Sequence, residues 1–267
     1  MKERSITYVV VPAMVFGFVL MFSLFYLNWG YFLSTYLTTD GSLLVVLVIL
    51  LRTGVVFSIG ILLFVKWHKQ EAQYFSDIRF LFSLFFLGLV FGKLGEIFYY
   101  FMYYHFSESL FVITLQVRFL WMILNLSPLF FVTFEILLYY VSENFQSISF
   151  LKKDNSKLIK RVLIIIILLI ETLLIFMATN VQTISLLYPI VTISSLLLVS
   201  WLFYLAHRYK RLKDVKPFIL FISFLIYVLN SIIRYALLLV FGTTPIYVLI
   251  SESSDLIVSF LILYGLT

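Results

Sequence analysis

Eight ionisable side chains interrupt otherwise apolar segments of this chain, and they are the residues best able to do chemistry. Four are basic and four are acidic: Arg52, Lys93, Glu96, Arg118, Glu171, Arg234, Glu252 and Asp255. A charge in the hydrocarbon core of a bilayer is costly unless it is paired or hydrated. Such residues form ion pairs, line a polar cavity for a solute or ion, or carry protons.

Helical spacing places several of these residues on shared faces. Two faces have the spacing i, i+3 and i+7: Glu252, Asp255 and Ser259 on one segment, and Tyr227, Asn230 and Arg234 on the segment before it. Because only a short turn joins the two segments, we expect Arg234 to pair with Glu252 or Asp255. Two carboxylates one turn apart repel each other, so one should hold a proton at neutral pH unless a second cation is near. Such a carboxyl would be a proton relay or a neutral donor in the core.

A third charged face combines opposite charges on one segment. Lys93 and Glu96 are three positions apart and can bridge each other. The same segment carries Gly88, Gly92 and Gly95, and small residues at such spacing allow helices to approach closely.

The remaining polar candidates come one from each of three other segments. Arg52 is the only basic group inside its segment, and Glu171 is the acidic residue best suited to pair with an arginine from another helix. Asn125 follows Arg118 by seven positions on a segment that Pro128 is expected to kink. The predicted ligand- or ion-binding set is therefore Arg52, Lys93, Glu96, Arg118, Asn125, Glu171, Asn230, Arg234, Glu252 and Asp255.

Several chemistries are excluded by what the sequence lacks. The chain has no cysteine, and its three histidines, His68, His105 and His207, lie at segment ends or in loops. No histidine is therefore available inside a segment to ligate haem or a buried metal, so we do not expect a haem- or copper-based redox protein, nor any other metal or cofactor. We find no HExxH, no Ser/His/Asp set, no P-loop and no catalytic residue to name. The net charge of +6 is better explained by membrane topology than by nucleic acid.

Composition identifies the elements that must position these residues. The chain is 63% hydrophobic and 12% charged, with a mean hydropathy of +1.10. Repeated apolar runs of about 20 residues predict an all-α, polytopic integral membrane bundle. We expect a single transmembrane domain over residues 1–267, with eight helices at about 7–27, 42–65, 79–104, 110–141, 158–178, 183–207, 216–241 and 245–266.

The distribution of basic residues predicts the topology. With eight spans, all 19 Lys and Arg residues except the four inside the segments fall on one side of the membrane. By the positive-inside rule both termini are cytoplasmic, and the protein resides in the cell membrane. The segments ending near 65 and 207 both read Leu-Phe-x-x-x-His followed by a basic residue. This hints at a parallel duplication of four helices plus four.

Depth unites the eight ionisable residues. Each lies roughly 10–16 Å below the outer surface at ~1.5 Å per residue, and their formal charges cancel. We therefore expect Lys93, Glu96, Arg234, Glu252 and Asp255 to converge on one cavity that is open to the outside.

The sequence is compatible with three classes of function: solute binding or transport, a structural role, and intramembrane catalysis. We favour binding or transport of a small polar or zwitterionic solute or ion, as a transporter or a sensor. The alternatives are a structural or assembly subunit, and an intramembrane enzyme on a lipid substrate that uses Glu252 or Asp255 as acid or base. Expected partners are the lipid bilayer, the solute, and an unidentified cytoplasmic or membrane protein bound through the basic loops.

Overall fold

The chain is helical throughout the part that its computed structural model describes, which is residues 7–38, 41–71, 74–102, 105–144, 153–212, 214–241 and 244–267. Within these ranges there are nine helices and no strand: α1 Thr7–Leu27, α2 Trp29–Thr38, α3 Ser42–His68, α4 Ile78–Met102, α5 Glu108–Asn144, α6 Lys153–Phe176, α7 Val181–Arg208, α8 Pro217–Phe241 and α9 Pro245–Leu266. Eight of them correspond to the eight hydrophobic segments. The short α2 was not predicted, because the expected helices were apolar runs of about 20 residues that can cross a bilayer, and α2 has only ten.

Seven of the described helices are long and apolar enough to cross a membrane: α1, α3, α4, α5, α7, α8 and α9. The protein is therefore a multi-pass helical membrane protein, as its composition predicts. The eighth long helix, α6, carries Lys160, Arg161 and Glu171 along its apolar stretch. Its role as an eighth span stays a prediction.

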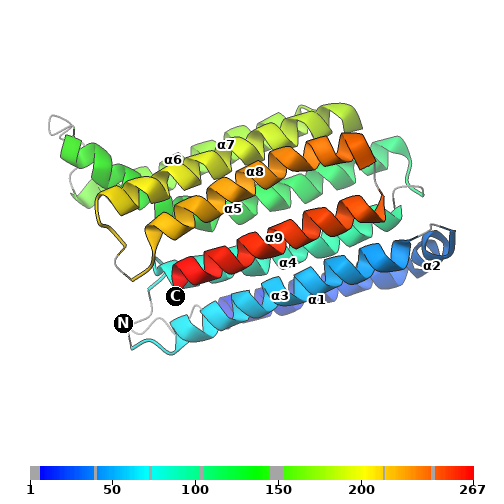
Figure 1. Cartoon of the computed structure of the whole chain (residues 1–267), viewed down its shortest axis with the longest axis horizontal. Coiled ribbons are helices and arrows are strands. Elements are labelled where there is room, and N and C mark those ends of the chain that lie inside the picture. The colour runs from blue at the N-terminus through cyan, green and yellow to red at the C-terminus, as the bar shows by residue number, and fades with distance from the viewer. Residues whose placement is uncertain are drawn as a thin grey trace.

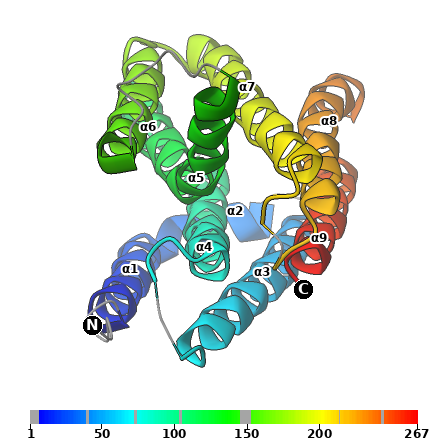
Figure 2. The ribbon, with the colours of Figure 1, turned by 90° about the vertical axis from the view of Figure 1, so that its left-hand side faces the viewer.

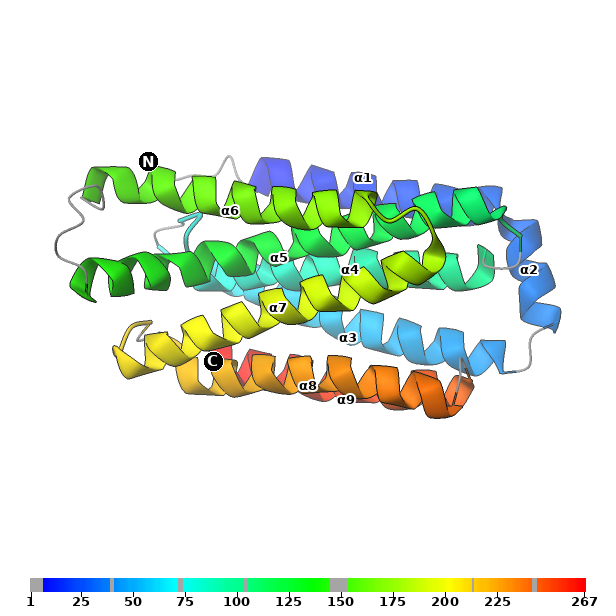
Figure 3. The same cartoon turned by 90° about the horizontal axis from the view of Figure 1, so that it is seen from above.

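Local sequence explains where several helices begin. The side chain of Asn180 caps α7 by accepting a hydrogen bond of 2.8 Å from the amide of Thr183. Proline stands first in α8 and α9, where its missing N–H costs no helical hydrogen bond. Pro128 does not end its helix, since α5 continues through it and extends beyond α8 and α9 at one end of the bundle (Figure 3).

Six helices form a closed ring. In order around the ring, α3 contacts α4, α4 contacts α5, α5 contacts α7, α7 contacts α8, α8 contacts α9, and α9 returns to α3. The view along the bundle shows this ring, with α1 and α6 outside it (Figure 2). Within the described residues, α1 packs on α4 and α2, whereas α6 packs mainly on α5. The ring is therefore the unit that can enclose a site.

The bundle has two unlike ends. The start of α1 and the end of α9 lie at one end, and α2 lies at the other, which we call the α2 end (Figures 1 and 3). The basic connections after α3 and α7 lie at the end opposite α2, as the predicted topology requires. The side of the membrane on which that end sits stays a prediction.

The predicted duplication remains open. The order of contacts in the ring is what a parallel repeat would produce, because α3, α4 and α5 are followed by α7, α8 and α9 in the same arrangement. The outer helices do not follow it, since α6 packs on α5 while α1 packs on α4 rather than on α9.

Candidate functional site

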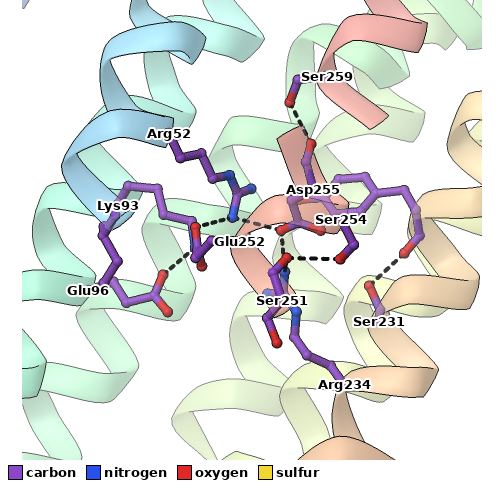
Figure 4. Close-up of polar contacts among 12 residues, drawn as sticks. Arg52, Lys93, Glu96, Ser231, Arg234, Ser251, Glu252, Ser254, Asp255 and Ser259 are labelled. Atoms are coloured by element: carbon purple, nitrogen blue, oxygen red, sulfur yellow. Dashed lines mark hydrogen bonds and ion pairs between the residues drawn. The ribbon is translucent and has the colours of Figure 1, made fainter. Parts of the chain in front are cut away.

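Seven of the eight predicted charges form one continuous chain of ion pairs inside the ring. Cations and carboxylates alternate along it in the order Arg118, Glu96, Lys93, Glu252, Arg52, Asp255, Arg234. Five helices contribute: α3, α4, α5, α8 and α9. Figure 4 shows Arg52 and Lys93 approaching the two carboxylates of α9 from one side, while Arg234 approaches from the other.

Arg52 lies at the centre of this chain. Its Nη1 is 2.6 Å from Glu252 Oε2 and 2.8 Å from Asp255 Oδ2, and its side chain is only 2% exposed. The ζ nitrogen of Lys93 binds the other oxygen of Glu252 at 2.7 Å and Glu96 Oε2 at 2.6 Å. Charge-assisted contacts of this length are among the stronger hydrogen bonds in proteins. Lys93 and Glu96 thus bridge each other as their spacing predicts.

The predicted contact between α8 and α9 is confirmed. Arg234 forms an ion pair with Asp255, and its Nη2 also donates to the carbonyl of Ser251 at 3.2 Å. The two carboxylates of α9 therefore have Arg52, Lys93 and Arg234 around them. Because these cations are present, the condition under which one carboxyl was expected to hold a proton is not met.

A cavity of about 270 Å³ lies beside this chain. Every helix of the ring lines it, and the lining residues are Arg52, Leu89, Gly92, Lys93, Glu96, Arg118, Phe119, Met122, Tyr188, Pro189, Thr192, Ile193, Tyr227, Ser231, Arg234, Tyr247 and Asp255. Tyr247 is near the first turn of α9, so the cavity extends from the α2 end into the bundle. A space of this size holds about nine waters at ~30 Å³ each, or a small solute.

The charged residues divide into a sealed group and a group that solvent-sized molecules reach. Arg52, Glu252 and Asp255 have side chains that are 2–3% exposed. Arg118 and Arg234 are 22% and 26% exposed, and Glu96 is 28% exposed. The sealed group binds the helices together, although Arg52 and Asp255 also border the cavity, as does Lys93 at 7% exposure, and the exposed group forms the part of the wall that is most open to solvent.

Glu252 does not line the cavity, contrary to its predicted convergence with the other four residues. Both of its carboxylate oxygens are held by cations, one by Arg52 and one by Lys93. It lies behind these two side chains, because its position on α9 faces α3 and α4 rather than the interior space.

Glu171 is not part of the charged chain, so its predicted pairing with an arginine is wrong. It lies on α6, outside the ring, and its Oε1 accepts a hydrogen bond from Ser195 on α7. Its Oε2 is buried and has no hydrogen-bond partner among the described residues. Glu171 was predicted to lie at the same membrane depth as the other charges, but it does not contact them, because the face of α6 that carries it is turned toward α7.

Asn125 and Asn230 also lie away from the cavity wall. Asn125 borders an apolar groove between α1, α4 and α5, where a Cβ on Gly88 would lie 1.7 Å from its Oδ1. The glycine therefore makes room for the amide. On α8 the cavity is lined by Tyr227, Ser231 and Arg234 but not by Asn230, although Asn230 shares a helix face with Tyr227 and Arg234.

Sequence reasoning missed the uncharged wall of the cavity. Tyr188 stacks on Phe119 with ring centroids 3.9 Å apart, and both residues line the space. Tyr188, Pro189 and Thr192 form one surface of α7, at a helix that carries no charge in its interior. Their only signal is a polar cluster around a proline within an apolar helix, which is weak evidence by itself.

Comparisons of the chain with models of known protein families, with curated protein sequences and with solved structures yielded no match. The arrangement therefore has to be interpreted from its own chemistry. The cavity wall combines arginines, several hydroxyl groups and aromatic rings, and this combination suits the recognition of a small solute. The described lining residues include no nucleophile placed beside a free base.

Proposed function

We propose that this protein binds a small polar or charged solute within its ring of six helices, as a transporter or a receptor of the cell membrane. The observation that carries the proposal is the cavity itself, which every helix of the ring lines and into which four cations and two carboxylates project. A protein that needed only a stable bundle would fill this space with apolar side chains, because buried ion pairs rarely stabilise more than good packing does.

Ligand sites in helical membrane proteins favour this setting. Polar and ionisable residues within such bundles face an interior space and mark the path of a substrate or ion. The partial exposure of Arg118, Glu96 and Arg234 supports access by small molecules from the α2 end. With both termini cytoplasmic, as the basic residues predict, the α2 end faces outward.

The alternatives have less support. Glu252 and Asp255 are poor candidates for an acid or base, because both are almost fully buried and each is bound by two cations. A structural role accounts for the sealed group around Arg52, but it gives no reason for the open space and for the hydroxyl groups that line it.

Cysteine accessibility tests the proposal in a chain that has no cysteine of its own. Ser231→Cys and Thr192→Cys place thiols on the cavity wall without removing a charge. A membrane-impermeant thiol reagent added to the outside of intact cells should label both. Ser34→Cys, half-buried on α2 outside the ring, is the positive control, and Ser200→Cys, buried on the same helix as Thr192, is the negative control.

The same variants separate the two kinds of solute protein. In a transporter, reagent applied to inside-out vesicles should also label Ser231→Cys, because a second state opens to the cytoplasm. In a receptor, labelling should come from the outside alone. If neither cavity cysteine reacts from either side while Ser34→Cys does, the space is sealed and the proposal fails.

A further inference from the structure

We infer that the solute is a small organic anion, held by Arg118 and Arg234 against the aromatic wall of the cavity. This inference rests on the proposed function and adds the chemical class of the ligand. In the sequence the eight charges cancel, which favours a zwitterion as the ligand. In the structure they do not cancel within the ring, because Glu171 lies outside it.

The charge of the site is positive. Four cations and two carboxylates line the cavity, and the third carboxylate, Glu252, lies behind Arg52 and Lys93. Counting all seven members of the chain still leaves one positive charge over. Within a low-dielectric bundle an excess charge attracts an ion of opposite sign far more strongly than it would in water.

The cations differ in how many carboxylates they contact. Arg52 and Lys93 are each bound to two carboxylates at short distances, so little of their charge is available to a ligand, although the Nε of Arg52 has no partner among the described residues. Among the described residues Arg118 has one acidic neighbour, Glu96, at 3.5 Å, which is beyond the usual range for a hydrogen bond. Its guanidinium therefore retains most of its five donors.

Arg234 also contacts a single carboxylate among the described residues, that of Asp255. Its Nη2 serves both Asp255 and the carbonyl of Ser251, and its Nε, like that of Arg52, is buried without a partner in the described part of the chain. Arg118 and Arg234 come from α5 and α8, which are not neighbours in the ring, and both line the space. Guanidinium groups match the paired oxygens of a carboxylate or phosphate.

The rest of the wall indicates that the anion carries an apolar part. Arg118 lies 5.3 Å from the ring of Tyr99 and 5.7 Å from the ring of Phe119, which hold its plane in place. Beyond it the lining is Phe119, Met122, Leu89 and Ile193. A bare inorganic ion would leave these side chains without a contact, whereas a carboxylate or phosphate on a short aliphatic or aromatic group would cover them.

The test uses thiol reagents of opposite charge on Ser231→Cys. The rate of labelling by a sulfonate-bearing methanethiosulfonate is divided by the rate of a trimethylammonium-bearing one, and this ratio is compared with that at Ser34→Cys. We expect the cavity ratio to be roughly tenfold higher or more, since one unit charge at about 10 Å has an effect of that size. Arg118→Gln and Arg234→Gln should each lower it several-fold, while Arg118→Lys restores it and Lys160→Gln leaves it unchanged.

Protection completes the test. Benzoate, hexanoate or phenyl phosphate should slow labelling of Ser231→Cys, and the uncharged analogue benzamide should not. A ratio at or below that of Ser34→Cys overturns the anion, and so does equal protection by benzamide or protection by none of the three anions. These outcomes leave the solute-binding proposal intact, because that proposal fails only if neither Ser231→Cys nor Thr192→Cys can be labelled while Ser34→Cys reacts.

Discussion

The two halves of the helical ring enclose very different interiors. At the α2 end the interior holds seven charged side chains and an open space. In the other half it is filled by phenylalanine, as Phe82, Phe203 and Phe224 from α4, α7 and α8 are fully buried with ring centroids 5.7–6.2 Å apart. Because α4, α7 and α8 line both halves, the helical framework does not force a cavity. The side chains decide where the ring is filled and where it stays open.

The two halves are stabilised by different interactions. Lipid tails are as apolar as Phe or Leu, so the aromatic half is stabilised chiefly by close packing and dispersion contacts. The charged half is held by ion pairs, and those of Arg52 with Glu252 and Asp255 are sealed from solvent, so no water can replace a lost partner there. We therefore expect the two halves to respond differently to the loss of one side chain.

The largest effect should come from breaking the sealed part of the charged half. Arg52→Leu leaves Glu252 with one cation and Asp255 with Arg234 alone, inside the bundle. Loss of one partner of a buried pair costs about 3–5 kcal/mol, so we expect a destabilisation of that order. Unfolding of the detergent-solubilised protein, monitored by circular dichroism, measures it.

A matched control lies on the same helix. Lys66→Leu removes an exposed basic residue from α3 at the opposite end, and it should change stability by less than about 0.5 kcal/mol. Adding Glu252→Leu to Arg52→Leu should recover part of the loss, because Lys93 keeps Glu96 and Asp255 keeps Arg234. Equal stability of Arg52→Leu and Lys66→Leu would mean that the charged chain does not hold the ring together.

A smaller effect is expected from the aromatic half. Phe224→Ala removes a ring that contacts Phe82, Phe85 and Phe203. At about 24 cal/mol per Å³ of residual cavity, a hole of order 100 Å³ costs about 2 kcal/mol. The labelling rate of Ser231→Cys should stay unchanged in this background. A change in that rate as large as the one caused by Arg118→Gln would show that the two halves are not independent.

The smallest effect should come from an ion pair outside both interiors. Lys160 on α6 lies 3.0 Å from Glu135 on α5, but the Glu135 side chain is 67% exposed. Lys160 is only 10% exposed, but its ammonium keeps a contact of 3.9 Å with the ring of Phe131 when Glu135 is neutralised. Because the carboxylate it loses is solvent-exposed, Glu135→Gln should alter the unfolding free energy by about 1 kcal/mol or less. A loss close to that of Arg52→Leu would contradict the view that burial within the ring, and not ion pairing as such, gives the charged half its stability.

The class of fold, and which charged residues lie inside the helices, could be predicted from the amino-acid sequence. Hydropathy over about 20-residue windows depends only on composition along one helix, so eight long helices and their approximate ends could be predicted. The pair Lys93–Glu96 follows from helical spacing, and Arg234–Asp255 follows from two helices joined by a short turn. Both contacts depend on chain positions that are close in sequence or linked by a short connection.

Which helix faces contact each other became clear only in the three-dimensional structure. Arg52 and Glu252 are 200 positions apart, and their pairing depends on the closure of the ring between α3 and α9. Glu171 has the same depth as the other charges, but α6 packs outside the ring, and helical periodicity carries no information about which neighbour a face will contact. The excess positive charge of the cavity and its aromatic wall follow from that packing, because side chains from six helices come together only when the ring closes.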